Sequence, residues 1–379
     1  MTVSFEQGPI RPPSEAGSLL IRLTRNCPWN RCAFCHTYRG ETYSRRRAPE
    51  VKADIDRAAE AARSLQDLSR RLGEGGEPGP ATVSALQRNP ALTPAEVSVA
   101  NFLLNGGRTA FLQDADPLAG PVEESAEVLR HLRKRFPSVR RVTTYCRSRT
   151  AARLGPEAFR TLKEAGLDRV HIGMESGSDA VLAFIRKGVT AEQHVAGGRA
   201  VKEAGLELSE YVMPGLGGVR WTEEHARESA AAVNRIGPDF VRLRTLAVIP
   251  TADLEREVRE GRLEPLGEDD TVREIRALVE GIETETRLES DHILNLLEEV
   301  QGDLPADKDR ILGVIDAYLA LPEEERVHFR IGRRSCAYRT LQDRNGPLRP
   351  RVDKILEALD IRSAKDADEA IREMVKRFV

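Results

Sequence analysis

The sequence has 379 residues, with 58 Lys or Arg, 60 Asp or Glu and a formal net charge of −2 at pH 7. This balance gives no electrostatic reason to expect nucleic acid or an anionic membrane as a partner. No run of about eighteen apolar residues is present, so the sequence predicts no membrane-spanning helix. The five cysteines are too few for a disulfide scaffold, which favours the reducing cytoplasm.

Short apolar segments alternate with helical patterns as far as residue 250. The predicted strands cover residues 18–24, 109–112, 141–145, 168–173, 207–213 and 239–248. The predicted helices between them cover residues 49–72, 94–104, 122–136, 156–165, 180–186, 191–204 and 223–235. Because parallel neighbours need a crossover connection, this alternation predicts an α/β fold with a parallel sheet. Six strands are too few for a closed TIM barrel, so we expect a partial (β/α)6 barrel.

The pattern changes beyond Pro250, where the sequence becomes charged and helical. Helices are predicted at residues 272–283, 292–300, 307–319, 352–359 and 368–378. We therefore expect three parts in chain order, with a helical insertion at about 63–105 inside the second. They are an N-terminal segment (1–17), the partial barrel (18–250) and a helical C-terminal extension (251–379).

Three of the five cysteines, Cys27, Cys32 and Cys35, lie within nine residues just after the first predicted strand. Thiolates in one short loop can converge on a metal with little further ordering. A structural zinc site would need His36 as the fourth ligand. A Cys32–Cys35 redox pair would leave Cys27 without a role. The third alternative is an iron–sulfur cluster with three thiolate ligands and one open iron. Unliganded thiols are disfavoured, because free cysteines usually lie in apolar surroundings and this loop is polar.

Other polar motifs also follow predicted strands, at the ends where parallel barrels carry their chemistry. Asp114 and Asp116 follow the second strand, and the segment Gly173-Met-Glu-Ser-Gly-Ser-Asp179 ends the fourth. Each has a structural alternative. Asp116 could cap a helix, Glu175 could be an acid in a first helical turn, and Lys187 could be a solvated cation at a helix end.

The pattern Cys27-x4-Cys32-x2-Cys35 after a first strand, with Phe34 before the last cysteine, resembles the radical S-adenosylmethionine (radical SAM) superfamily. The commonest spacing in that family has three residues between the first two cysteines, and this chain has four. The segment 173–179 resembles the branch that includes the elongator-type proteins, methylthiotransferases and oxygen-independent coproporphyrinogen oxidases. The resemblance implies a 4Fe–4S cluster held by the three cysteines, with S-adenosyl-L-methionine chelated at the fourth iron.

The resemblance also implies roles for residues outside the cysteine loop. Asp114 and Asp116 replace the family's glycine-rich turn, so a carboxylate would meet the methionine ammonium group. Glu175 would contact the cofactor, and Lys187, or Arg186 beside it, would bind the cofactor's carboxylate. The glycine-rich segment after Met213 would bring backbone against the adenine. The implied cofactor-binding residues are Phe34, Asp114, Asp116, Glu175, Ser176, Lys187 and Met213.

The activity implied by the resemblance is reductive cleavage of S-adenosylmethionine to a 5′-deoxyadenosyl radical. The radical would abstract hydrogen from an unidentified small-molecule substrate, with a reduced flavodoxin- or ferredoxin-type electron donor. Neither nucleic acid nor a membrane is expected as a partner. One alternative is a coproporphyrinogen-oxidase-like protein that grips tetrapyrrole propionates through basic residues, for which the sequence offers Arg242, Arg244, Arg333 and Arg334. Another is a non-catalytic, metal-stabilised binding protein.

Three further features stay open at the level of sequence. Cys146, at the end of the third predicted strand, is a core residue or a hydrogen donor. His292 is a cap for the predicted helix 292–300 or a substrate contact. Arg242 and Arg244 share one face of the sixth strand and point either inward to an anion or outward to helix acids.

Overall fold

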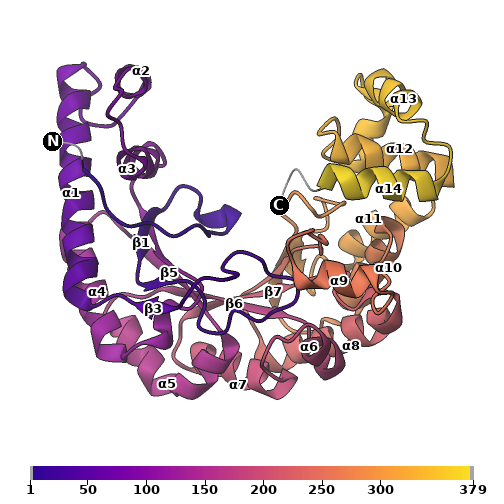
Figure 1. Cartoon of the computed structure of the whole chain (residues 1–379), viewed down its shortest axis with the longest axis horizontal. Helices are drawn as coiled ribbons and strands as arrows, with labels where there is room; N and C mark the ends of the chain where they lie inside the picture. Colours follow the sequence, from indigo (N-terminus) through magenta and orange to yellow (C-terminus); the bar gives the residue numbers. More distant parts are fainter. Residues whose placement is uncertain (1–2, 376–379) are drawn as a thin grey trace. The chain divides into compact units, whose positions relative to one another are not determined.

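The computed structural model describes residues 3–375 (Figure 1). It divides into two compact units. The first unit comprises the described residues up to 30, together with 37–172 and 200–208. The second comprises 31–36, 173–199 and the described residues from 209 onward. The main sheet has the strand order β1-β4-β5-β6-β7-β8-β9-β10.

The first unit is built on parallel strands whose residues are almost fully buried. The strands are β1 (Leu19–Arg22), β4 (Thr109–Gln113), β5 (Arg141–Cys146) and the first part of β6 (Arg169–Glu175). β1 pairs with β4, β4 with β5 and β5 with β6, all in parallel. The side chains of Phe111 and Leu112 are fully buried, as expected for strands covered on both faces. A separate hairpin joins β2 (Thr24–Arg25) to β3 (Ser44–Arg45).

The helices of the first unit lie in the chain between its successive strands. They are α1 (Ala48–Arg71), α2 (Pro80–Gln87), α3 (Pro94–Leu104), α4 (Val122–Arg135) and α5 (Ser148–Glu164), with single 3-10 turns at Pro13–Glu15 and Pro117–Ala119. In α1, Pro49 occupies the first turn and Glu50 accepts the N-cap backbone N–H of Arg47, so the sequence marks its start clearly. Helices α1, α4 and α5 lie along one side of the strands (Figure 1).

The second unit continues with β7 (Glu207–Val212, from Ser209), β8 (Phe240–Leu243), β9 (Thr286–Glu289) and β10 (Gly302–Leu304). The first three strands are parallel, and β10 runs antiparallel to β9. Its helices are α6 (Asp179–Phe184), α7 (Ala191–Glu203, to Arg199), α8 (Gly218–Ile236), α9 (Asp253–Arg259), α10 (Glu268–Gly281), α11 (Lys308–Leu319), α12 (Glu323–Arg334), α13 (Arg349–Ala358) and α14 (Ala364–Val375), with a 3-10 turn at Leu341–Asn345.

The predicted α/β class, with a mostly parallel sheet and a helical C-terminal part, is confirmed. The count of six strands was too low, because β9 and β10 follow residue 250. In β9 only Thr286 and Leu288 face the interior, and the intervening charged residues hide the apolar pattern. The part boundaries at residues 17 and 250 stay predictions.

The predicted helix at residues 292–300 is wrong. This segment forms turns, and the carbonyl groups of residues 293–296 accept hydrogen bonds from arginine side chains. Arg333 donates to the carbonyls of Asn295 and Leu296, and Arg334 donates to those of the two residues before them. A capping role for His292 is excluded with the helix. The two arginines are also unavailable to grip propionates.

Candidate functional site

Cys27 belongs to the first unit, in a loop shaped by two asparagines. Asn26 and Asn30 have φ values of 66° and 48°, in the left-handed region that asparagine tolerates better than most residues. The backbone N–H of Asn30 donates to the Cys27 sulfur at 3.4 Å, and the Asn30 side chain donates to the carbonyl of Tyr38. The loop therefore holds the sulfur of Cys27 next to a backbone N–H donor.

Asp114 follows β4 in the first unit, and its carboxylate is fully buried. Its Oδ2 accepts from Nη2 of Arg22 at 2.7 Å and from Nε at 3.1 Å, while the Tyr38 hydroxyl donates to Oδ1. Burial raises the pKa of Asp114, although the nearby Arg22 guanidinium opposes the rise. Both oxygens thus have partners from the chain, and contact with a cofactor ammonium stays a prediction.

Asp116 is also fully buried, and it holds the start of α5. Its Oδ1 accepts the backbone N–H of Arg147 at 3.1 Å, and its Oδ2 accepts the Thr150 hydroxyl at 2.6 Å. The pKa of Asp116 is raised by burial, and these hydrogen bonds offset only part of that rise. The carboxylate therefore holds the residues at the start of α5, whereas the 3-10 turn Pro117–Ala119 that follows Asp116 has no side-chain cap. Contact of Asp116 with the cofactor stays a prediction.

In the second unit, Glu175 ends β6 and forms an ion pair with Lys187, twelve residues later. The Lys187 Nζ lies 2.9 Å from Glu175 Oε1, and each side chain is only 12% exposed. Glu175 has a φ of 65°, which a residue with a side chain adopts at a cost. A Cβ added at Gly173 would lie 2.3 Å from Glu175 Oε1 and 3.2 Å from Lys187 Nζ. The glycine therefore leaves room for the ion pair, and the structure excludes a first-turn helix acid and a solvated cation.

The segment 31–36, which carries Cys32 and Cys35, is anchored beside this ion pair. The backbone N–H of Ala33 donates to the Ile185 carbonyl, and the Ala33 carbonyl accepts from Leu254, both at 2.8 Å. Phe34 packs against the apolar clusters of the second unit, and the Lys187 Nζ lies 5.6 Å from the centroid of its ring. Phe34, from the cysteine motif, therefore lies beside Glu175 and Lys187, which the resemblance of segment 173–179 implied.

Met213 and Ser176 belong to the supporting structure around the pair. Met213 is 7% exposed and packs in the same apolar cluster as Phe34, and its N–H donates to the Glu175 carbonyl at 2.9 Å. Ser176 donates to Nδ1 of His225 at 2.8 Å, and Nε2 of that ring donates to the Met213 carbonyl at 3.1 Å. Burial lowers the pKa of His225 to about 4, so the ring is neutral at neutral pH.

Sequence reasoning missed His225 and also Glu274, which fixes the glycine-rich segment after Met213. Oε1 of Glu274 accepts the N–H of Gly215 at 2.6 Å, and Oε2 accepts the hydroxyl of Thr222 at 2.7 Å. Burial raises the pKa of Glu274 to about 7. His225 lies on α8 and Glu274 on α10, and both helices carry many charged residues. Nothing in the sequence therefore indicated that these two side chains are buried.

Cys146 is the other cysteine that the sequence left open. It is 2% exposed, its sulfur lies 3.5 Å from the carbonyl of Arg147, and burial raises the pKa of its thiol well above the usual value. These surroundings are those of a core cysteine.

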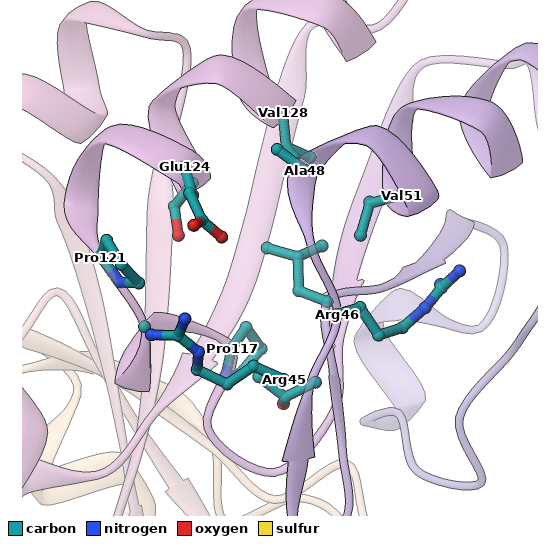
Figure 2. Close-up of a pocket in the computed structure, with 12 residues that line it drawn as sticks. Arg45, Arg46, Ala48, Val51, Pro117, Pro121, Glu124 and Val128 are labelled. Carbon is teal, nitrogen blue, oxygen red and sulfur yellow. The ribbon is translucent and has the colours of Figure 1, made fainter.

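A surface pocket in the first unit plays no part in this arrangement (Figure 2). It is open to solvent and lies between β3 and the starts of α1 and α4, and Figure 2 shows Arg45 and Glu124 among the residues that line it. Arg46, which also lines it, is already bound to Asp54 and to the Arg22 carbonyl. No predicted site residue lines the pocket, so we assign it no role.

The thiols have the chemistry that an iron–sulfur cluster requires. Cys27, Cys32 and Cys35 are each partly exposed, and no cysteine among the described residues forms a disulfide. Partly exposed thiols in one loop are suitable cluster ligands. Within residues 3–375, no three His, Cys, Asp or Glu side chains stand in a metal-binding arrangement. Cys27 and the other two cysteines belong to different units. The ligand set therefore stays a prediction.

Residues 87–230 match a family model described as the radical SAM superfamily. The chain carries a radical SAM domain. The superfamily consists of enzymes. The matched stretch of this domain includes Asp114, Asp116, Glu175, Ser176, Lys187 and Met213, whereas the three loop cysteines lie before it.

One curated relative and several solved structures resemble the chain. A tRNA uridine(34) acetyltransferase of Methanocaldococcus jannaschii is 24% identical over 119 residues, which are 31% of this chain and 22% of that protein. Elp3 of Methanocaldococcus infernus is 16% identical, covers 48% of each chain and has a TM-score of 0.39. Coproporphyrinogen III oxidase of Escherichia coli is 15% identical, with 66% and 49% coverage and a TM-score of 0.41.

The cobalamin-dependent radical enzyme OxsB is 11% identical, with 94% of this chain and 52% of that chain covered and a TM-score of 0.47. The chain spans about half of the length of each of these solved structures and less of the curated relative. Because each of these TM-scores is below 0.5, the fold is established by the strands and helices of the chain itself. No helix among the described residues is long and apolar enough to cross a bilayer.

Proposed function

We propose that the chain is a radical SAM enzyme that holds a 4Fe–4S cluster through Cys27, Cys32 and Cys35 and binds S-adenosylmethionine beside it. The matched radical SAM domain supports the proposal, together with one observation in the second unit. The segment that carries Cys32 and Cys35 is anchored through Phe34 next to the Glu175–Lys187 ion pair. Cys27, Cys32 and Cys35 would hold the cluster, which, once reduced by an external electron donor, would supply the electron for reductive cleavage of S-adenosylmethionine.

The ion pair has the two charges that the amino-acid part of S-adenosylmethionine requires. Lys187 offers an ammonium group to the cofactor's carboxylate. Glu175, in place of Asp114, offers a carboxylate to its ammonium group, because Arg22 and Tyr38 already bind Asp114. The two side chains hold one another in place before the cofactor enters, so less ordering is needed on binding. The apolar residues around Phe34 and Met213 exclude water from this part of the site.

Anaerobic reconstitution with iron and sulfide tests the proposal directly. We expect about four iron atoms per chain and, after reduction with dithionite, formation of 5′-deoxyadenosine and methionine in equal amounts. Stoichiometric zinc with no cleavage of S-adenosylmethionine would instead identify a non-catalytic, metal-stabilised protein. Chromatography with mass detection measures both products.

The same assay addresses the substrate and the partners. A small molecule, a flavodoxin- or ferredoxin-type donor and a cytoplasmic location stay part of the proposal. The curated relative is named for tRNA, so transfer RNA is the macromolecular alternative. Assays with and without added tRNA separate the two classes, because a true substrate increases the rate of 5′-deoxyadenosine formation. For the tetrapyrrole alternative, only Arg242 and Arg244 remain available.

A further inference from the structure

The strands of the second unit have one face covered by helices and one polar face. Val212 on β7 lines a small void together with residues of α8 and α10, so the face of Val212 is the helix-covered one. Tyr211, Arg242 and Glu289 are register partners on β7, β8 and β9, and they share the opposite face. A polar row thus crosses three adjacent strands on the face away from α8 and α10.

Arg242 is the buried centre of this row. The residue is 6% exposed, and its Nη1 donates to Asp291 at 2.7 Å. Its Nε is also buried and has no hydrogen-bond partner among the described residues. Leaving such a donor unsatisfied is costly, so the atom points to an acceptor that the chain does not supply.

Arg244 extends the same face beyond the carboxyl end of β8. Its backbone N–H donates to the Val212 carbonyl at 3.0 Å, which fixes the start of the side chain. The side chain is exposed, and among residues 3–375 its guanidinium has no hydrogen bond or ion pair. The acids nearest in register are already paired, because Asp291 binds Arg242 and Glu289 binds Arg287. The positive charge of Arg244 is therefore available to a ligand.

His292 supplies a third donor beside Arg244. Its Nδ1 accepts the backbone N–H of Leu294 at 3.3 Å, which places the proton of the neutral ring on Nε2. Burial and the charge of Arg244 lower the pKa of His292 to about 4, so the ring is neutral at neutral pH. The Nε2–H has no acceptor among the described residues and is free to donate.

The segment after β9 is held rigidly against the end of β8. The Asn295 side chain donates to the Leu243 carbonyl at 2.8 Å and accepts the backbone N–H of Thr245 at 3.0 Å. These bonds flank Arg244 on both sides. The donors around it are therefore preorganised rather than carried on a loose loop.

We propose that Arg244, Nε of Arg242 and Nε2–H of His292 form the subsite for an anionic group of the substrate, a carboxylate or a phosphate. The inference rests on the proposed function, because it takes the occupant to be the substrate of a radical SAM enzyme. The site lies at the carboxyl ends of β8 and β9, where parallel α/β sheets bind their ligands. A substrate bound at this subsite would carry at least one negative charge.

The test measures binding of simple anions to the full chain without S-adenosylmethionine. Ligand-detected NMR would follow inorganic phosphate, glutarate and the uncharged analogue glutaramide. We expect phosphate or glutarate to bind and glutaramide not to bind, and the preferred anion distinguishes the two sources of charge. Arg244→Gln should weaken that binding tenfold or more and His292→Ala less so. Arg273→Gln, at an exposed arginine of α10, is the matched control and should bind as the wild type does.

Failure of this inference and failure of the proposed function give different results. If the wild type binds no anion, or if Arg244→Gln binds as tightly as the wild type, the anionic subsite is overturned, whatever the cleavage assay gives. If binding depends on Arg244 but no 5′-deoxyadenosine forms, the anion site stands and the proposed chemistry fails.

Discussion

The Nζ of Lys187 lies 2.9 Å from Oε1 of Glu175 and 5.6 Å from the ring centroid of Phe34. One ammonium group thus joins the end of β6 to the residue that precedes Cys35. The loss of either contact would disturb both the predicted cofactor pair and the predicted cluster loop.

Lys187→Gln should weaken the binding of S-adenosylmethionine by about 10- to 100-fold, because a charge-assisted bond to the cofactor's carboxylate is lost; this corresponds to about 1.4–2.7 kcal/mol. Equilibrium dialysis with the reconstituted protein measures the change. Arg186→Gln is the matched control, since Arg186 is exposed and pairs with Asp253. The opposite result, with weak binding only in the Arg186 variant, would assign the carboxylate to Arg186.

Serine substitution of Cys27, Cys32 or Cys35 should each remove most of the iron from the reconstituted protein, because a cubane with two protein ligands is not held stably. Cys336→Ser, at the exposed cysteine, should keep the full iron content. Iron analysis and visible absorbance report the outcome. If Cys27→Ser retains its cluster and cleaves S-adenosylmethionine, Cys27 is not a ligand.

The sequence predicted the buried strands well because their apolar runs are continuous. The run at 109–112 became β4 almost unchanged. The prediction from sequence failed where side chains distant in the chain decide the local structure. Residues 292–300 have a helical pattern, yet buried Arg333 and Arg334 take their carbonyl groups. No local pattern reveals such a competitor.

The candidate site shows the same division. The resemblance of segment 173–179 to the radical SAM superfamily implied Glu175 and, twelve residues later, Lys187, and these two side chains do form an ion pair. The partners of Asp114 and Asp116 were not found, since Arg22 and Thr150 come from other elements. The contact between Ser176 and His225 likewise joins residues 49 positions apart.

Glu274 should make stability fall as the pH rises. Its folded pKa of about 7 exceeds the ordinary value of 4.5, so the unfolded chain loses this proton first. Stability from this group is present below about pH 4.5 and is lost as the pH rises through 7, by up to about 3 kcal/mol. Glu274→Gln cannot titrate, so the wild type's advantage over it should shrink between pH 5 and 8. Urea unfolding at several pH values measures this, and parallel curves would contradict the assignment.

Gly177 follows Glu175 closely and cannot accept a side chain. A Cβ there would lie 2.2 Å from the backbone oxygen of Glu228 on α8, and backbone cannot move aside cheaply. Gly177→Ala should therefore destabilise the fold by about 3 kcal/mol or more. It should also weaken S-adenosylmethionine binding, because the residues that position Glu175 must shift.

Gly313→Ala is the matched control. Gly313 lies in α11 with no heavy atom within 4 Å of an added Cβ, so alanine should stabilise by up to about 1 kcal/mol. Thermal unfolding compares the stability of the two variants. Equal stability would show that the backbone of Glu228 does not approach Gly177 as closely as 2.2 Å.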